Sequence, residues 1–167
     1  AFFPLTQLFG GPTWTRIIHP YIGVIMALSF LGLFFRFKHL NKMTPADKEW
    51  LAKAKNMVDG NDHDMPEQGK YNGGQKVMFW VLAVCMLLMT VSGLLIWRAW
   101  FGFDITLVRL GAVVHAAAAA VMIGLIMVHV YAAIWVKGTV RAMWYGTVTR
   151  AWAKQHHRGW YRQITGK

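Results

Sequence analysis

The sequence predicts an all-α integral membrane protein, a transmembrane helical bundle, and two observations carry this prediction. The chain has 167 residues, of which 56% are hydrophobic and only 15% are charged, whereas a soluble domain has about 25% charged residues. Three runs of 19, 21 and 27 residues contain no charged side chain, at 17–35, 77–97 and 110–136. A helix needs about 20 apolar residues to cross the hydrocarbon core of a bilayer, so each run can span it.

Helices are the expected conformation of all three runs, because inside hydrocarbon a helix satisfies its own backbone polar groups and a loop cannot. The alternative is a set of buried helices in a larger soluble protein, but helices in such proteins average about 11–12 residues. We therefore expect membrane helices at 17–36, 77–98 and 109–137.

Lys and Arg are distributed unequally among the segments outside these runs. Eight lie in 36–76 and seven in 137–167, against one before the first run and two in 98–109. The positive-inside rule places the more basic side in the cytoplasm. We therefore expect a cytoplasmic loop at 37–76, with some short surface helix, and a cytoplasmic tail at 138–167, with periplasmic segments at 1–16 and 99–108.

The same distribution accounts for the formal net charge of +11. A basic balance also suits nucleic acid binding, but here it follows membrane topology and attraction to membrane lipid with anionic headgroups, so no nucleic acid partner is expected. Cys85 is the single cysteine of the sequence, which excludes an internal disulfide, a Cys-x-x-Cys metal site and covalent Cys-x-x-Cys-His haem attachment. We expect Cys85 to serve packing.

Three of the seven histidines lie in the apolar runs: His19, His115 and His129. Ionisable residues inside a span are costly and mark functional sites, and imidazole is a ligand of haem iron. His115 and His129 are 14 residues apart in one expected helix, which separates them by about 21 Å along its axis and about 40° around it. One helix then offers a ligand in each leaflet, as two stacked haems require; interhelical hydrogen bonds are the alternative.

His19 opens the first expected span on the outer side, so it can pair with His115 but cannot reach the depth of His129. Gly23 follows His19 by four residues and Gly111 precedes His115 by four. Small residues at these spacings give room for a flat macrocycle or simply for another helix. We expect the other four histidines to be solvated surface residues: His39, His63, His156 and His157.

Several stretches of the sequence are shared with a known family. The most specific are KYNGGQKVMFW at 70–80 and MVHVYAAIWVKG at 127–138. The others are IIHPYIG at 17–23, VSGLLIWR at 91–98, VVHAAAA around His115 and RAWAKQHHRGWYR at 150–162. Over nearly its whole length the chain thus resembles the cytochrome b (gamma) subunit of respiratory formate dehydrogenase.

The resemblance implies a four-helix di-haem cytochrome b fold, of which three spans are present here and the family's first transmembrane helix is not. It implies two b haems, with His19 and His115 as axial ligands of the outer haem iron and His129 as one ligand of the inner haem. The other inner ligand belongs to the family's first helix, so the inner haem and quinone pocket are expected to be incomplete. The residues that match the family's quinone site are Asn72, Gly74, Gln75 and His129. From the residues alone, the stretch 72–75 is better explained as a helix cap and turn.

The implied function is electron transfer from an iron–sulfur (beta) subunit through the haems to menaquinone or ubiquinone, reduced at the cytoplasmic side of the bacterial inner membrane. Formate oxidation would lie in a molybdenum- or tungsten-containing alpha subunit, so no catalytic residue for it is expected here. A trimer of such heterotrimers is a further expectation. The alternatives are the cytochrome b subunit of a nickel–iron hydrogenase or related molybdoenzyme, and a non-redox membrane anchor.

Overall fold

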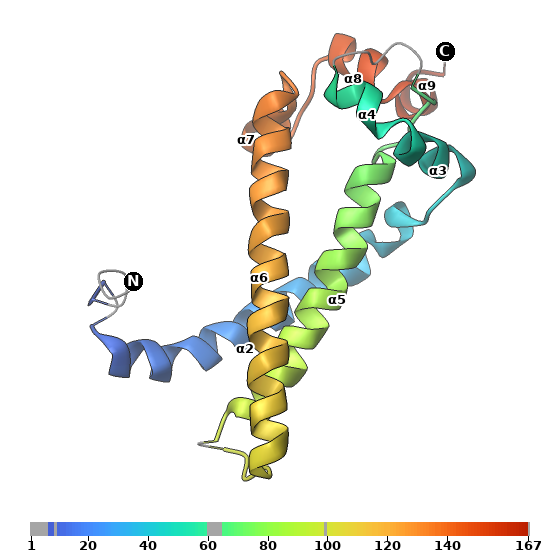
Figure 1. The fold of residues 1–167 in the computed structure, drawn as a ribbon. Coiled ribbons are helices and arrows are strands. Elements are labelled where there is room, and N and C mark those ends of the chain that lie inside the picture. The colour runs from blue at the N-terminus through green and yellow to red at the C-terminus, as the bar shows by residue number, and fades with distance from the viewer. Residues whose placement is uncertain (1–6, 9, 60–64, 99, 167) are drawn as a thin grey trace. The chain divides into compact units, whose positions relative to one another are not determined.

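The computed structural model describes residues 7–8, 10–59, 65–98 and 100–166, and the regular elements of this part of the chain are all helical. Three helices are long: α2 (Pro12–Phe37), α5 (Gly73–Ile96) and α6 (Ile105–Trp135) (Figure 1). By length and composition all three can cross a membrane. The predicted fold class, an all-α protein with three membrane helices, is therefore confirmed.

Among the residues that the structure describes, six short helical elements follow α2 and α6. After α2 come η1 (Lys38–Asn41), α3 (Pro45–Ala52) and α4 (Ala54–Val58), and after α6 come α7 (Thr139–Tyr145), α8 (Arg150–His156) and α9 (Arg158–Thr165).

The long helices extend past the uncharged runs at their N-terminal ends. α2 begins at Pro12, α5 at Gly73 and α6 at Ile105, so that Arg16, Lys76 and Arg109 lie inside helices. A charged residue near a helix end does not stop the helix, because its side chain can reach toward the aqueous interface or, as Lys76 does, pair with a buried carboxylate. The runs therefore mark the apolar core of each helix and not its ends.

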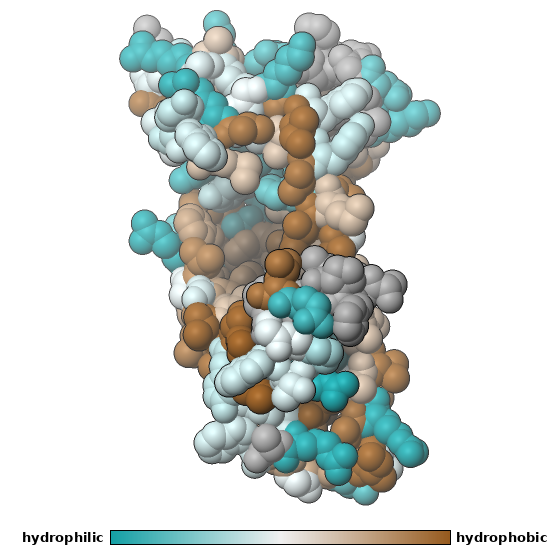
Figure 2. Space-filling view, turned by 90° about the vertical axis from the view of Figure 1, so that its left-hand side faces the viewer, coloured by the Kyte–Doolittle hydropathy of each residue, from teal (hydrophilic) through white to brown (hydrophobic). Residues whose placement is uncertain are grey.

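Apolar side chains remain exposed along the long helices. None of the 18 residues in the most apolar window of the first span is buried, and exposed apolar side chains appear in brown on the face drawn in Figure 2. The rest of the described chain leaves most of these apolar side chains uncovered, so the long helices do not form the buried core of a water-soluble domain. Lipid satisfies such a surface, and the chain is a multi-pass membrane protein.

The chain divides into two compact units, each of which takes part of every long helix. The first comprises 1–36 and 83–122, and the second 37–82 and 123–167. In the first unit, the rings of Tyr21 on α2 and Trp97 just after α5 meet edge to face, 5.3 Å apart. A Cβ added at Gly111 on α6 would lie 3.0 Å from the Cβ of Leu95 and 3.3 Å from the Ser92 carbonyl oxygen. Gly111 therefore serves close packing of α6 on α5, one of the two uses predicted for it.

In the second unit, α3 is tied to the first turn of α5. Asp47 Oδ2 accepts hydrogen bonds from the Thr44 N–H at 2.7 Å, the Thr44 hydroxyl at 2.6 Å and Lys76 Nζ at 2.6 Å. Asp47 and Lys76 are 1% and 6% exposed. Burial raises the pKa of Asp47, but the hydrogen bonds from Lys76 and Thr44 outweigh it and hold the pKa below its usual value. Asp47 is therefore ionised at neutral pH.

The tail packs back onto the segment before α5. His157 is 4% exposed, and its Nδ1–H donates to the Gly69 carbonyl oxygen at 2.8 Å. The indole of Trp152 stacks on the same imidazole, with centroids 5.1 Å apart, and the Trp160 N–H donates to the Gln68 carbonyl. The prediction that His157 is a solvated surface residue was therefore wrong, because a contact 88 residues away in sequence buries the ring.

The other predicted surface histidines have different outcomes. His39 is exposed, as predicted, and His156 is half-buried against Trp152. His63 lies outside the described residues. Cys85 is a buried free thiol within α5, in agreement with a packing role.

Candidate functional site

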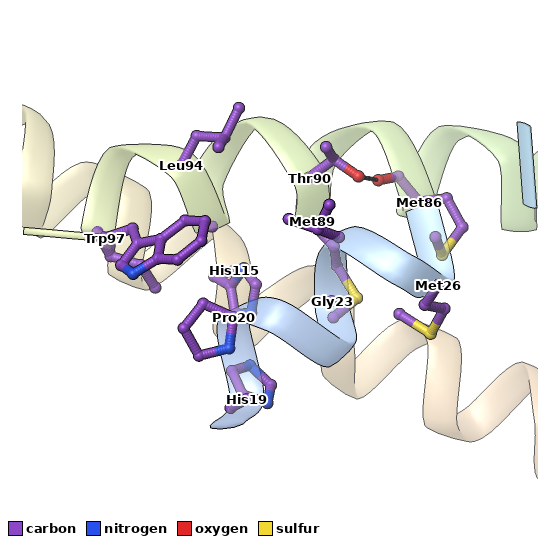
Figure 3. Close-up of a pocket in the computed structure, with 13 residues that line it drawn as sticks. His19, Pro20, Gly23, Met26, Met86, Met89, Thr90, Leu94, Trp97 and His115 are labelled. Carbon is purple, nitrogen blue, oxygen red and sulfur yellow. Dashed lines mark hydrogen bonds between the residues drawn. The ribbon is translucent and has the colours of Figure 1, made fainter. Parts of the chain in front are cut away.

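The first unit brings two predicted haem ligands together. His19 on α2 and His115 on α6 lie with their ring centroids 6.1 Å apart and their planes at 82° (Figure 3). Two imidazoles on opposite sides of one metal would stand about 6 Å apart, since each metal–nitrogen bond is about 2 Å and each nitrogen lies about 1 Å from its ring centre. The observed separation therefore suits two axial ligands of one iron.

These two histidines line a pocket of about 540 Å³, a volume that includes the space open to the surroundings. Apart from the histidines its walls are mostly apolar, formed by side chains that include Pro20, Val24, Met86, Met89, Leu94 and Trp97. The hydroxyl of Thr90, which also lines it, donates to the carbonyl of its own helix at Met86.

The wall of this pocket is open at Gly23. A Cβ added there would meet no other atom within 4 Å, unlike the tightly packed Gly111. Small size at Gly23 therefore makes room in the pocket and not for a neighbouring helix within this chain. An apolar pocket with two imidazoles and an open wall is chemically suited to a b haem, which imidazoles hold through the iron.

Two residues of α5 set the position of the His115 ring. Ser92, 2% exposed, has its Oγ 3.0 Å from His115 Nδ1 and 2.5 Å from the Leu88 carbonyl oxygen. A Cβ added at Gly93 would lie 3.4 Å from His115 Cε1, so a larger side chain would press on the ring. Neither residue was predicted as a site residue, although the Ser-Gly pair lies in the VSGLLIWR stretch.

The third predicted ligand, His129, lies on α6 within the second unit and is half-buried. Among the described residues, no hydrogen bond to His129 is present and no group of three or more His, Cys, Asp or Glu side chains could hold a metal ion. The structure therefore offers one imidazole at this position.

The stretch 72–75 caps α5, as the residues alone suggested. The Gln75 N–H donates to Asn72 Oδ1 at 2.9 Å, and the Asn72 N–H donates to Gln75 Oε1 at 3.0 Å. This reciprocal pair satisfies orphan donors at the start of the helix. Both side-chain oxygens are thus engaged, while the two amide NH₂ groups are the donors that each side chain can still direct at a ligand.

The predicted quinone residue Gly74 already has an aromatic neighbour. A Cβ added at Gly74 would lie 3.0 and 3.1 Å from two carbons of the Trp50 six-membered ring. Glycine lets a flat ring approach the backbone here, and that ring is the chain's own Trp50 on α3. Any quinone at this turn would therefore lie beside Trp50, a residue that the sequence pattern did not single out.

Comparison with known proteins places the chain in a family. A family model described as prokaryotic cytochrome b561 matches residues 2–146. The chain is 41% identical to the nitrate-inducible formate dehydrogenase cytochrome b556(Fdn) subunit of Escherichia coli strain K12, over 98% of its own length and 78% of that protein. The chain belongs to the family of formate dehydrogenase cytochrome b556 subunits.

Two more relatives support this membership. The formate dehydrogenase cytochrome b556(fdo) subunit of Escherichia coli strain K12 is 43% identical over 96% of this chain and 76% of its own length. The formate dehydrogenase cytochrome b556 subunit of Haemophilus influenzae is 38% identical over 97% of this chain and 71% of its own length. The predicted resemblance is confirmed, and membership in a cytochrome b family implies haem b as a cofactor.

Proposed function

We propose that this chain is the electron-transfer and quinone-reducing membrane subunit of a formate dehydrogenase. It would receive electrons from an iron–sulfur subunit and pass them through two b haems to menaquinone or ubiquinone. The observation that carries the proposal is the His19–His115 pair, 6.1 Å apart across an apolar pocket. The relatives' names supply formate dehydrogenase as the complex.

His19 and His115 would hold the outer haem, each through its ring nitrogen Nε2 or Nδ1 not used elsewhere. When bound, the haem supplies a reversible one-electron carrier whose potential depends on its axial ligands. The mostly apolar walls of the pocket would face the macrocycle, and Gly23 leaves space for it. The chain itself would thus supply the iron ligands, the apolar surroundings of the haem and the space that it fills.

His129 would be one ligand of the inner haem, the other belonging to a helix that precedes this segment in the family. Asn72, Gly74, Gln75 and His129 would form the quinone site. The amide NH₂ groups of Asn72 and Gln75 can donate to quinone carbonyl oxygens. Because the turn lies at the end of a membrane helix, a quinone head there can meet both lipid and water.

The orientation follows from the basic residues. The segments 36–76 and 137–167 carry fifteen of the eighteen Lys and Arg residues, and on that ground we assign the loop 37–76 and the tail 138–167 to the cytoplasm of a bacterial inner membrane. Electrons that enter at the periplasmic side and meet protons from the cytoplasm then move charge across the membrane. Each charge moved against 100 mV stores about 2.3 kcal/mol.

The test is a reduced-minus-oxidised visible spectrum of the intact complex, followed by His19→Ala and His115→Ala. Each variant is expected to lose one b haem and keep the other, as measured by haem content per complex. A wild-type spectrum in both variants would contradict the assignment. A wild-type complex without any b-haem band would instead favour the non-redox membrane anchor.

A further inference from the structure

Ser92 is the one described side chain that touches a proposed haem ligand through a hydrogen bond. We propose that Ser92 is a positioning residue: its hydroxyl fixes the tautomer and the plane of the His115 imidazole, so that Nε2 is the nitrogen offered to the haem iron. This inference rests on the proposed function of His115.

The direction of the hydrogen bonds can be worked out from the atoms. A serine hydroxyl has one proton and a backbone carbonyl oxygen has none. The 2.5 Å contact between Ser92 Oγ and the Leu88 carbonyl oxygen therefore uses the Ser92 proton, the usual bond of a helical serine to the residue four positions back. With that proton engaged, the 3.0 Å contact to His115 is made by Nδ1–H donating to Ser92 Oγ, and the backbone carbonyl of Met89 also accepts from this imidazole.

This arrangement leaves His115 Nε2 without a proton. A neutral imidazole carries one N–H and one lone pair, and the hydrogen bond at one nitrogen decides which nitrogen can bind a metal. Metal-ligating histidines commonly donate their other N–H to a protein oxygen, and loss of that partner costs about 10–100-fold in metal affinity or activity. The Ser92–His115 contact has the form of such an outer-shell bond.

The packing of α5 against α6 makes the contact possible. Gly111, one turn before His115, brings α6 so near α5 that a Cβ would lie 3.3 Å from the Ser92 carbonyl oxygen. Gly93, next to Ser92, leaves room for the imidazole edge. Gly93, Gly111 and Ser92 thus hold the His115 ring in one position, whereas among the described residues no hydrogen bond orients His19.

The same bond is expected to tune the outer haem. An Nδ1–H that donates to oxygen makes the imidazole a stronger electron donor at Nε2, which favours ferric over ferrous iron and lowers the reduction potential. Removing the hydroxyl should therefore raise the potential of this haem alone. A tenfold change in the ferric-to-ferrous affinity ratio corresponds to about 59 mV for one electron.

The experiment compares Ser92→Ala and the near-isosteric Ser92→Cys with Ser29→Ala in the intact complex. Ser29 makes the same bond to the carbonyl four residues back, Ile25, but touches no histidine. We expect potentiometric titration to give a raised potential for one haem in both Ser92 variants. The rise should be smaller in Ser92→Cys, because the thiol sulfur is a weak acceptor and keeps part of the hydrogen bond that Ser92→Ala loses. The ferric EPR signal of that haem should change as well, while Ser29→Ala matches the wild type.

Each failure has its own signature. If either Ser92→Ala or Ser92→Cys assembles and both haem potentials and EPR signals stay at wild-type values, Ser92 does not position His115. If His115→Ala itself keeps both haems, the ligand assignment fails and the proposed function fails with it. Loss of one haem in Ser92→Ala, with the other retained, supports the role of Ser92 in positioning His115.

Discussion

At the scale of single residues, the two proposed outer ligands are held in different ways. His115 has a hydrogen-bond partner and a glycine against its ring on α5. His19 is exposed, its ring meets the His115 ring, and no hydrogen bond to it is present among the described residues. A cofactor between the rings would therefore find one fixed ligand and one that can adjust, which eases insertion of a bulky macrocycle.

Asn72 combines two roles that a substitution can separate. Asn72→Ser keeps a side-chain oxygen for the cap of α5 but removes the amide NH₂. If that NH₂ donates to quinone, haem reoxidation by a menaquinone analogue should slow by about three- to tenfold, the value of one hydrogen bond. Stopped-flow spectroscopy measures the rate, with haem content and thermal stability as controls.

The competing explanation of Asn72 makes a clear counter-prediction. If Asn72 only caps the helix, Asn72→Ser should reoxidise at the wild-type rate, while Asn72→Leu, which loses the cap, should lower thermal stability. That pair of results would remove Asn72 from the quinone site.

Gly23 and Gly32 provide a matched pair on α2. At both positions an added Cβ meets nothing within 4 Å of it in the chain, but only Gly23 lines the pocket. We expect Gly23→Leu to assemble and lose the outer haem, because the side chain fills space that the macrocycle needs. Gly32→Leu should keep both haems. Haem content per complex is the measurement, and equal haem content in the two variants would contradict a cofactor beside Gly23.

At the scale of helices, what the sequence could predict depended on the range of the interaction. Uncharged runs are a local property, and they correctly predicted three membrane helices but missed their N-terminal ends. The cap at 72–75 is also local, and the residues alone suggested it. Three features depend on contacts between segments far apart in sequence, for which a single sequence has no periodic signal. They are the positioning of His115 by Ser92, the Trp50 ring against Gly74 and the burial of His157.

The docking of the tail should depend on pH through His157. Burial lowers the pKa of His157 more than its bond to the Gly69 carbonyl raises it. The packed state therefore binds the proton less well than the free tail does, so docking is at full strength above about pH 6.5 and weakens as the pH falls below it. A spin label at Gln163→Cys on α9 should become more mobile between pH 8 and pH 5.

His157→Gln is the control for this titration. Its amide can still donate to the Gly69 carbonyl but has no proton to gain, while His156 remains. The label should then show the same mobility at both pH values. A persisting pH response would assign the effect to His156 or to the Glu67–Arg162 ion pair.

At the scale of the whole molecule, the exposed apolar helices and the unequal distribution of basic residues are both typical of a membrane protein. The long helices leave apolar side chains uncovered by the chain, which lipid and partner subunits can cover. The polar segments on one side contain the buried ion pair and the docked tail, so that side has a folded polar structure of its own. On the proposed topology, this is the side where quinone and protons meet.

Cysteine labelling tests that topology directly. In a Cys85→Ser background, single cysteines replace Lys154 on α8 and Phe103 in the connection before α6, both exposed. A membrane-impermeant maleimide applied to intact spheroplasts should label position 103 and not position 154, because the proposed topology places the tail, with its excess of basic residues, inside. Permeabilised cells should label both, which shows that each cysteine is reactive. Labelling of position 154 without permeabilisation would reverse the orientation, and with it the side from which protons reach the quinone.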